Sequence, residues 1–281
     1  MKRLIINVDD VGFSDSINEA VKKCYSKKVI SGVSIMSGGD FFEEAVDMLK
    51  DINKTEVGVH LTLTGKTHPC ANSNDTSTIL TKEGMFFEGY FEFMKYYFLN
   101  KINMDEIYLE FRSQILKIKN SGLEITHLDS HEHVHLFPKV LHIVLKLAKE
   151  FNIPFVRLPN ERYITYTLKF TLKDVLRHFG LKLFSLYAKK IIENGDVKSN
   201  NIFWGHFHSG RVDKEILSFF IKNVLQGVNE LCIHPAIKSE KLILNFPWFK
   251  KSHIELEALL SDDWKEECLQ NNISIVSHSE I

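Results

Sequence analysis

The chain has 281 residues, of which 44% are hydrophobic and 25% charged, an ordinary composition for one large globular domain or two small ones. Its formal net charge of −1 gives no electrostatic basis for binding nucleic acid or an anionic membrane. No segment approaches the roughly 20 consecutive apolar residues that span a bilayer, so we expect no membrane association.

The first part of the chain alternates predicted strands with predicted helices. An apolar run at residues 4–8 predicts a buried strand, and helical spacing of apolar residues follows it. β-Branched residues predict strands at 29–35 and 57–63, with a helix at 41–49 between them. This alternation is typical of a parallel sheet with crossover helices.

The alternation resumes further along the chain. Helices are predicted at 104–121 and 138–151, on either side of a strand at 124–128. Further strands are expected at residues 155–158, 202–205, 228–233 and 273–276. The number of alternating units favours a barrel-like α/β domain, with an open doubly wound sheet as the alternative.

Two segments do not fit this alternation. The first, near residues 65–100, begins with a polar loop, and the second, near 160–200, is basic, aromatic and helical. We interpret both as insertions into a single α/β domain that spans residues 1–281.

The four cysteines are far apart and include no C-x-x-C pair, which gives no indication of a zinc knuckle or a redox motif. They are Cys24, Cys70, Cys232 and Cys268. Scattered cysteines of this kind are typical of reduced thiols. The apolar run at residues 4–6 is too short for the core of a secretion signal. We therefore expect a cytoplasmic protein.

Polar clusters follow the predicted strands at their carboxyl ends. They are Asp9 with Asp10, His60, residues 129–135, His206 with His208, and His234. Taken singly, each has a structural explanation, since adjacent acids cap helices and a lone histidine packs in a core. In parallel α/β folds, however, active sites are assembled at this edge of the sheet. Five clusters at corresponding strand ends therefore predict a site.

One of these clusters is rich in histidine. His127, Asp129, His131, His133 and His135 fall within nine residues, although the whole chain has only 13 histidines. Alternate residues of an extended segment project to the same side, so we expect several of these imidazoles to converge. A histidine-rich loop without a function is the alternative.

The combined pattern predicts a catalytic metal site. Two neutral imidazoles and one carboxylate leave coordination positions open for water and substrate. We expect Asp10, His60 and His131 to be the ligands, and Asp9 to be a general base towards the attacking water. His234 is placed to donate a proton to a leaving amine, with a structural histidine in a turn as the alternative. Mg or Zn is the expected ion, and Mn or Co also suits these ligands.

Four segments resemble the signature segments of the YdjC-like (chitooligosaccharide deacetylase) family. They are VDDVG at 8–12, GVHLTLT at 58–64, THLDSHEHVH at 126–135 and CIHPA at 232–236. Their order and spacing match, and the resemblance extends from residue 3 to about residue 260. The second and third segments are specific, whereas an acidic pair after a first strand is weak alone.

The resemblance implies an irregular (β/α) barrel related to the polysaccharide-deacetylase fold. It also implies hydrolysis of the acetamide of N-acetylglucosamine-containing oligosaccharides, with release of acetate. By position, Asp10, His60 and His131 match the family's metal ligands, Asp9 its base and His234 its acid. The expected partner is thus an N-acetylated sugar.

The sequence departs from the family pattern at two positions. Val11 stands where phenylalanine is usual, and Glu132 where histidine is common. Neither change removes a ligand on this assignment, but both leave the substrate contacts open. Residues 160–210 match no family pattern.

Other residues have weaker indications of substrate contact. Arg157 follows a strand and is a candidate to bind a sugar hydroxyl or an acetate carboxylate, with a surface ion pair as the alternative. His133 and His206 are candidates to line the cleft. An aromatic patch at 86–98 is interpreted first as packing, and second as the contact of a homodimer or a sugar platform.

Two other functions remain open at this point. A metal site of Asp and His on a barrel also suits hydrolysis of another amide or of a phosphoester, although few Arg or Lys residues lie near the strand-end motifs. A non-catalytic carbohydrate- or metal-binding protein is the other alternative. Asp9 argues against it, because a binding site needs no base beside its ligand.

Overall fold

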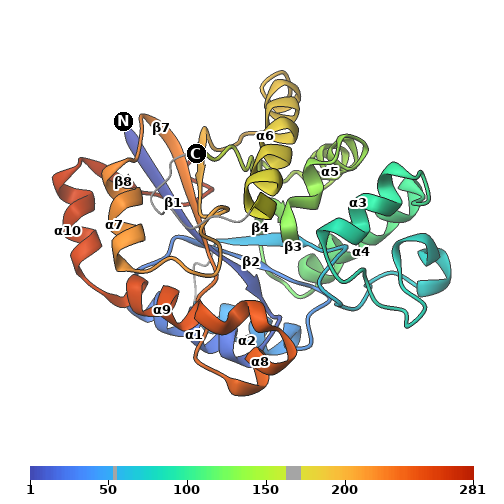
Figure 1. Cartoon of the computed structure of the whole chain (residues 1–281), viewed down its shortest axis with the longest axis horizontal. Coiled ribbons are helices and arrows are strands. Elements are labelled where there is room, and N and C mark those ends of the chain that lie inside the picture. The colour runs from blue at the N-terminus through green and yellow to red at the C-terminus, as the bar shows by residue number, and fades with distance from the viewer. Residues whose placement is uncertain (53–55, 163–171) are drawn as a thin grey trace.

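A parallel sheet forms the centre of the computed structural model, which describes residues 1–52, 56–162 and 172–281 (Figure 1). Within these residues the sheet has eight strands in the order β5-β4-β3-β2-β1-β7-β6, and β8 pairs with β1. The strands are β1 Lys2–Val11, β2 Gly32–Ile35, β3 Val57–Leu61, β4 Ile125–Ser130, β5 Phe155–Val156, β6 Ile202–Trp204, β7 Gly227–Ile233 and β8 Ile273–Ile275.

The two edges of the sheet approach each other. Isolated parallel bridges join Phe155 to Lys198 and Glu161 to Phe203, so the segment after β5 contacts β6 at the opposite edge. These bridges join the sheet into an incomplete barrel. The predicted irregular (β/α) barrel is therefore confirmed, and the open doubly wound sheet is excluded.

Helices surround the strands (Figure 1). They are α1 Asp15–Ser26, α2 Phe42–Ile52, α3 Tyr90–Phe98, α4 Met104–Asn120, α5 Pro138–Phe151, α6 Leu172–Ile192, α7 Lys214–Lys222, α8 Glu240–Asn245, α9 Ser252–Leu260 and α10 Asp263–Gln270, with short 3₁₀ turns η1 Ser73–Asp75, η2 Ser77–Ile79, η3 His131–Leu136 and η4 Pro247–Lys251. Local sequence begins several of them: the Ser14 hydroxyl accepts a hydrogen bond from the Ile17 amide, and Pro138 occupies the first turn of α5. Among the described residues, no helix is both long and apolar enough to cross a membrane.

The strands separate an apolar layer from a polar interior. Ile6 and Val8 of β1 belong to the main hydrophobic core cluster, whereas the alternate residues Asn7 and Asp9 hydrogen bond to each other. All four are buried, so the polar pair lies inside the barrel rather than in solvent. The barrel interior is therefore polar beneath the carboxyl ends of its strands.

The segments predicted as insertions contain helices of their own. The aromatic patch at 86–98 includes α3, and Phe86, Phe87 and Phe93 are buried. Its interpretation as packing is thus confirmed for these side chains. In the second segment, α6 accounts for the helical pattern, and residues 163–171 lie outside the described residues.

Candidate active site

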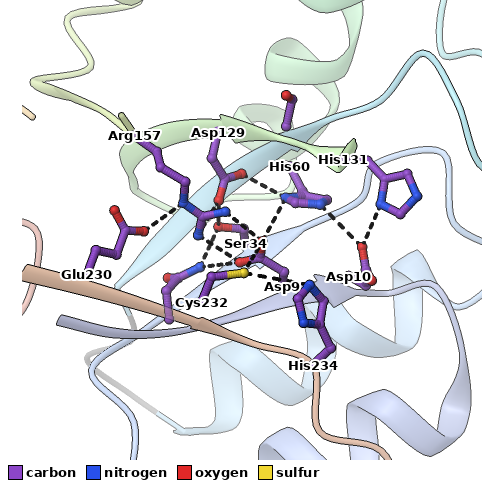
Figure 2. Close-up of polar contacts among 12 residues, drawn as sticks. Asp9, Asp10, Ser34, His60, Asp129, His131, Arg157, Glu230, Cys232 and His234 are labelled. Atoms are coloured by element: carbon purple, nitrogen blue, oxygen red, sulfur yellow. Dashed lines mark hydrogen bonds and ion pairs between the residues drawn. The ribbon is translucent and has the colours of Figure 1, made fainter. Parts of the chain in front are cut away.

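Three of the predicted site residues meet at the carboxyl edge of the sheet (Figure 2). Oδ1 of Asp10, at the end of β1, lies 3.2 Å from Nε2 of His60 and 3.0 Å from Nδ1 of His131. His60 is on β3, and His131 directly follows β4. One ligand atom from each of these residues lies within 4.8 Å of the others. The geometry therefore brings together an oxygen and two nitrogens in the donor set expected for a divalent metal.

Asp10 has a strained backbone conformation and a buried, ionised side chain. Its φ of 62° lies in the left-handed region, which few residues other than glycine adopt. Its Oδ2 atom is buried and, among the described residues, has no hydrogen-bond partner. Burial raises the pKa of Asp10, but His131 and His60 outweigh this and hold it below its usual range. A buried, ionised carboxylate with an unpartnered oxygen fits a bound cation.

A second carboxylate, that of Asp129 on the adjacent strand β4, orients the imidazole of His60. Oδ1 of Asp129 lies 2.8 Å from Nδ1 of His60, and Oδ2 of Asp129 accepts a hydrogen bond of 2.7 Å from the Ser34 hydroxyl. A carboxylate can only accept, so Nδ1 carries the proton and Nε2 is directed to Asp10. This is the arrangement that fixes a metal-binding imidazole in one tautomer.

Arg157 lies beneath the site, where it is wholly buried. Its guanidinium lies 2.6 Å from Asp9, 2.7 Å from Asp129 and 2.7 Å from Glu230. The expectation that Arg157 contacts substrate is wrong, and so is its alternative of a surface ion pair. The physical reason is that three buried carboxylates need a compensating charge, and Arg157 supplies it.

Hydrogen-bond donors surround Asp9. Arg157 donates to both of its oxygens, at 2.6 and 2.8 Å. Asn7 donates to Oδ1 at 2.8 Å, and the Cys232 thiol donates to Oδ2 at 3.0 Å. Burial raises the pKa of Asp9, but Arg157 and His60 hold it well below its usual range. Asp9 is therefore an ionised, rigidly positioned carboxylate beside the Asp10 triangle.

His234 follows β7 and lies on the side of Asp9 away from Arg157 (Figure 2). Its Nε2 atom is 3.6 Å from the sulfur of Cys232, and its ring meets that of Trp248 edge to face with centroids 4.9 Å apart. Its backbone amide donates to Glu255 at 2.6 Å. Burial lowers the pKa of His234 by more than Asp10 and Asp9 raise it.

The histidine-rich cluster does not converge as predicted. Residues 131–136 form the kinked 3₁₀ turn η3 instead of an extended segment, with Glu132 and His133 at positive φ. The ring of His127 stacks on that of His278, with centroids 3.4 Å apart. Nε2 of His135 lies 3.0 Å from the carbonyl oxygen of Arg157. The expectation failed because the alternation of an extended strand ends with β4.

The site opens into a cleft of about 310 Å³. His133 and His206, both predicted to contact substrate, lie in its wall. Trp248 stands at the rim with 43% of its surface exposed. The remaining lining includes Asp9, Asp10, His60, His131, Cys232, His234, Phe13, Lys66, Glu88, Glu132, Phe246 and Phe249. A cavity of this size and mixed lining is typical of a small-molecule site.

The sequence interpretation missed the residues that support the site. Ser34, Asp129, Glu230 and Cys232 received no role, although each is buried in contact with a site residue or with Arg157. A signal existed, because polar residues alternate within otherwise apolar strands, as in Glu230, Cys232 and His234. Alternate positions face the same side of a sheet, so this pattern predicts a polar barrel interior.

Comparisons with known proteins identify the family and the fold of the chain. A family model described as YdjC-like protein matches residues 3–270. The protein named "Carbohydrate deacetylase" of Thermoanaerobacter pseudethanolicus is 26% identical over 280 residues, 99% of each chain, and that of Clostridium beijerinckii is 31% identical over 77% of this chain and 84% of its own. The crystal structure of a candidate cellobiose-phosphate cleavage protein of Enterococcus faecalis V583 has a TM-score of 0.79 at 23% identity, covering 99% of this chain and 98% of that one, and shares the fold.

Proposed function

This chain belongs to the YdjC-like protein family, and we propose that it is a metal-dependent hydrolase that removes N-acetyl groups from N-acetylglucosamine-containing oligosaccharides and releases acetate. One observation carries the proposal: the Asp10, His60 and His131 triangle lies in a cleft with the ionised Asp9 beside it. The relatives named "Carbohydrate deacetylase" support the substrate class.

The triangle would hold a divalent metal, with Mg or Zn as the proposed ion and Mn or Co also suited to it. The unpartnered Oδ2 of Asp10 and the orientation of His60 by Asp129 support this fit. Such an ion supplies Lewis acidity, which polarises the acetamide carbonyl and acidifies the attacking water.

Asp9 accepts the proton of the attacking water in this proposal. Hydrogen bonds from the buried Arg157 and Asn7 hold its carboxylate in place, so the base does not have to reorient during the reaction. Because its pKa lies well below the usual range, Asp9 is ionised and free to accept this proton, and it releases the proton readily before the next turnover.

His234 donates a proton to the leaving nitrogen, from the side of Asp9 away from Arg157 (Figure 2). The products are acetate and a free amino sugar. His133, His206 and Trp248 contact the sugar from the cleft wall, where the exposed indole offers a stacking surface for a pyranose ring.

The redox state of the cysteines indicates the kind of cellular compartment. All four are unpaired in the structure. Free thiols of this number support a reducing compartment, and we propose the cytoplasm.

The test is a panel of substrates given to metal-stripped protein and to protein reloaded with Mg²⁺, Mn²⁺, Co²⁺ or Zn²⁺. The panel contains N-acetylglucosamine, diacetylchitobiose, longer chitooligosaccharides, other acylated amines and phosphoesters. We expect metal-dependent acetate release from the acetylated sugars. Phosphate release, or turnover of other amides alone, would overturn the substrate assignment. Metal and sugar binding without turnover of any compound would establish the non-catalytic alternative.

A further inference from the structure

A second group of donor atoms lies beside the Asp10 triangle. Asp9, Cys232 and His234 are all buried, and one ligand atom from each lies within 4.8 Å of the others. All three line the same cleft, so a solvated ion can reach them. Figure 2 shows their side chains meeting on the side of Asp9 away from His60.

The distances within this group approach those of a metal site. With the bond lengths usual for zinc, the sulfur-to-nitrogen edge of a tetrahedron is about 3.5 Å. The Cys232 sulfur is 3.6 Å from Nε2 of His234 and 3.0 Å from Oδ2 of Asp9. The sulfur-to-oxygen edge has to widen by about half an ångström. The oxygen-to-nitrogen edge, between Asp9 and His234, is no longer than 4.8 Å. Within the described part of the chain, Nδ1 of His234 makes no hydrogen bond and lies 3.9 Å from Oε2 of Glu255. No hydrogen bond at Nδ1 therefore prevents that atom from carrying the ring proton while Nε2 binds an ion.

The donor types distinguish this group from the first triangle. Asp10, His60 and His131 offer one oxygen and two nitrogens, whereas Asp9, Cys232 and His234 offer oxygen, nitrogen and sulfur. A thiolate selects soft ions such as Zn²⁺ and Cd²⁺, and Mg²⁺ avoids it.

The charge of the interior also favours a second cation. Four carboxylates are buried in this interior, those of Asp9, Asp10, Asp129 and Glu230, and all but that of Asp10 pair with the buried guanidinium of Arg157. One divalent ion on Asp10 leaves this group with a formal negative charge. A second divalent ion, bound together with a thiolate at Cys232, would bring the formal charge to zero.

We propose that Asp9, Cys232 and His234 form a second, thiophilic cation site that binds Zn²⁺ or Cd²⁺ and is inhibitory. On binding, the S–H bond of Cys232 breaks, its proton leaves to solvent, and the sulfur lone pair forms the bond to the ion. The ion then occupies the position where the thiol proton bonded to Asp9. Inhibition rests on the proposed function, because the ion engages the base and the proton donor of that reaction.

The test is a Co²⁺ titration of the metal-stripped protein, followed by absorption spectroscopy and by equilibrium dialysis. We expect two bound ions, the second with the near-ultraviolet charge-transfer band of a thiolate–cobalt bond. Cys232→Ser should lose the band and one ion. Cys70→Ser, which removes a thiol outside the cleft, should keep both, and His131→Ala should keep the band. A single bound ion without the band, or a band that survives in Cys232→Ser, would overturn the proposal.

Activity gives the second readout. Zn²⁺ in excess of one equivalent should inhibit acetate release, and the concentration for half inhibition should rise at least roughly tenfold in Cys232→Ser, measured against that variant's own uninhibited rate. Equal sensitivity of both proteins would refute the inhibitory role. If no acetate is ever released, the proposed function fails, while the dialysis and the absorption band still decide whether the second site exists.

Discussion

His60 and Asp129 are register partners on the adjacent strands β3 and β4, and Nδ1 of His60 lies 2.8 Å from Oδ1 of Asp129. The pairing of the two strands therefore fixes which imidazole nitrogen faces Asp10. Because the barrel itself sets this orientation, the Asp10 triangle is preorganised before any ion arrives.

Replacing Asp129 with asparagine tests this orientation. Asp129→Asn weakens the acceptor for Nδ1 of His60, and we expect the affinity for a divalent metal to fall about 10- to 100-fold. Glu230→Gln is the matched control, because Glu230 also pairs with Arg157, while His60 is paired with Asp129 and not with Glu230. Isothermal titration calorimetry measures the metal affinity of both variants. An equal loss of affinity in the two variants would mean that Arg157, rather than His60 orientation, controls binding.

Arg157 is expected to be essential for stability. Arg157→Met leaves Asp9, Asp129 and Glu230 buried without their shared counter-charge, and the free energy of unfolding should fall by about 3–5 kcal/mol. Chemical denaturation measures this loss. Arg112→Met, which removes a partly exposed partner of Glu150, should change it little. Comparable losses in both variants would contradict the assigned role of Arg157.

Metal affinity should rise with pH. Burial lowers the pKa of His60, but Asp129 and Asp9 raise it to about 10. In the metal-free protein His60 is therefore protonated at neutral pH, and an ion has to displace this proton. The apparent affinity should increase about tenfold per pH unit for each proton released, between about pH 6 and about pH 9. Competition titrations check this, and an affinity independent of pH would show that His60 is not a ligand.

The role of His234 has its own pH signature. Its pKa lies below the ordinary value of 6.5, so its protonated fraction already falls below pH 6.5 and continues to fall as the pH rises through the neutral range. If His234 protonates the leaving amine, kcat/KM should decline with rising pH through the neutral range. His234→Gln should lower kcat/KM about 10²- to 10⁴-fold and lose that decline. A variant that retains the decline would assign it to another group.

Much of the fold follows from patterns local in the sequence. Residues 4–8 and 57–63 carry the apolar runs of β1 and β3, and the strand ends place Asp10 and His60 at one edge of the sheet. The rule that sites lie at this edge therefore predicts the polar clusters at the strand ends, and the coordination chemistry of a divalent metal favours Asp10, His60 and His131 among them.

The buried ion pairs of Arg157 could not be predicted from local sequence patterns. Arg157 follows the shortest strand, β5, and nothing local in the sequence indicates that it is buried between Asp9 and Glu230. That contact depends on closure of the barrel, which brings β4, β5 and β7 around one interior. Likewise, the turn η3 redirects His133 and His135 through a backbone kink that no residue type in this segment requires.

In the proposed mechanism, the Asp10, His60 and His131 triangle would hold the activating metal while Asp9 acts as the base. The most direct test measures Mg²⁺ binding and acetate release together, in the parent protein and in Asp9→Asn and His131→Asn. In the parent, acetate release should rise in proportion to bound Mg²⁺. Asp9→Asn should bind the ion yet lose at least about 100-fold in rate, and His131→Asn should lose both binding and activity. Acetate release by the metal-stripped parent would show that the reaction needs no metal, and an undiminished rate in Asp9→Asn would show that Asp9 is not the base.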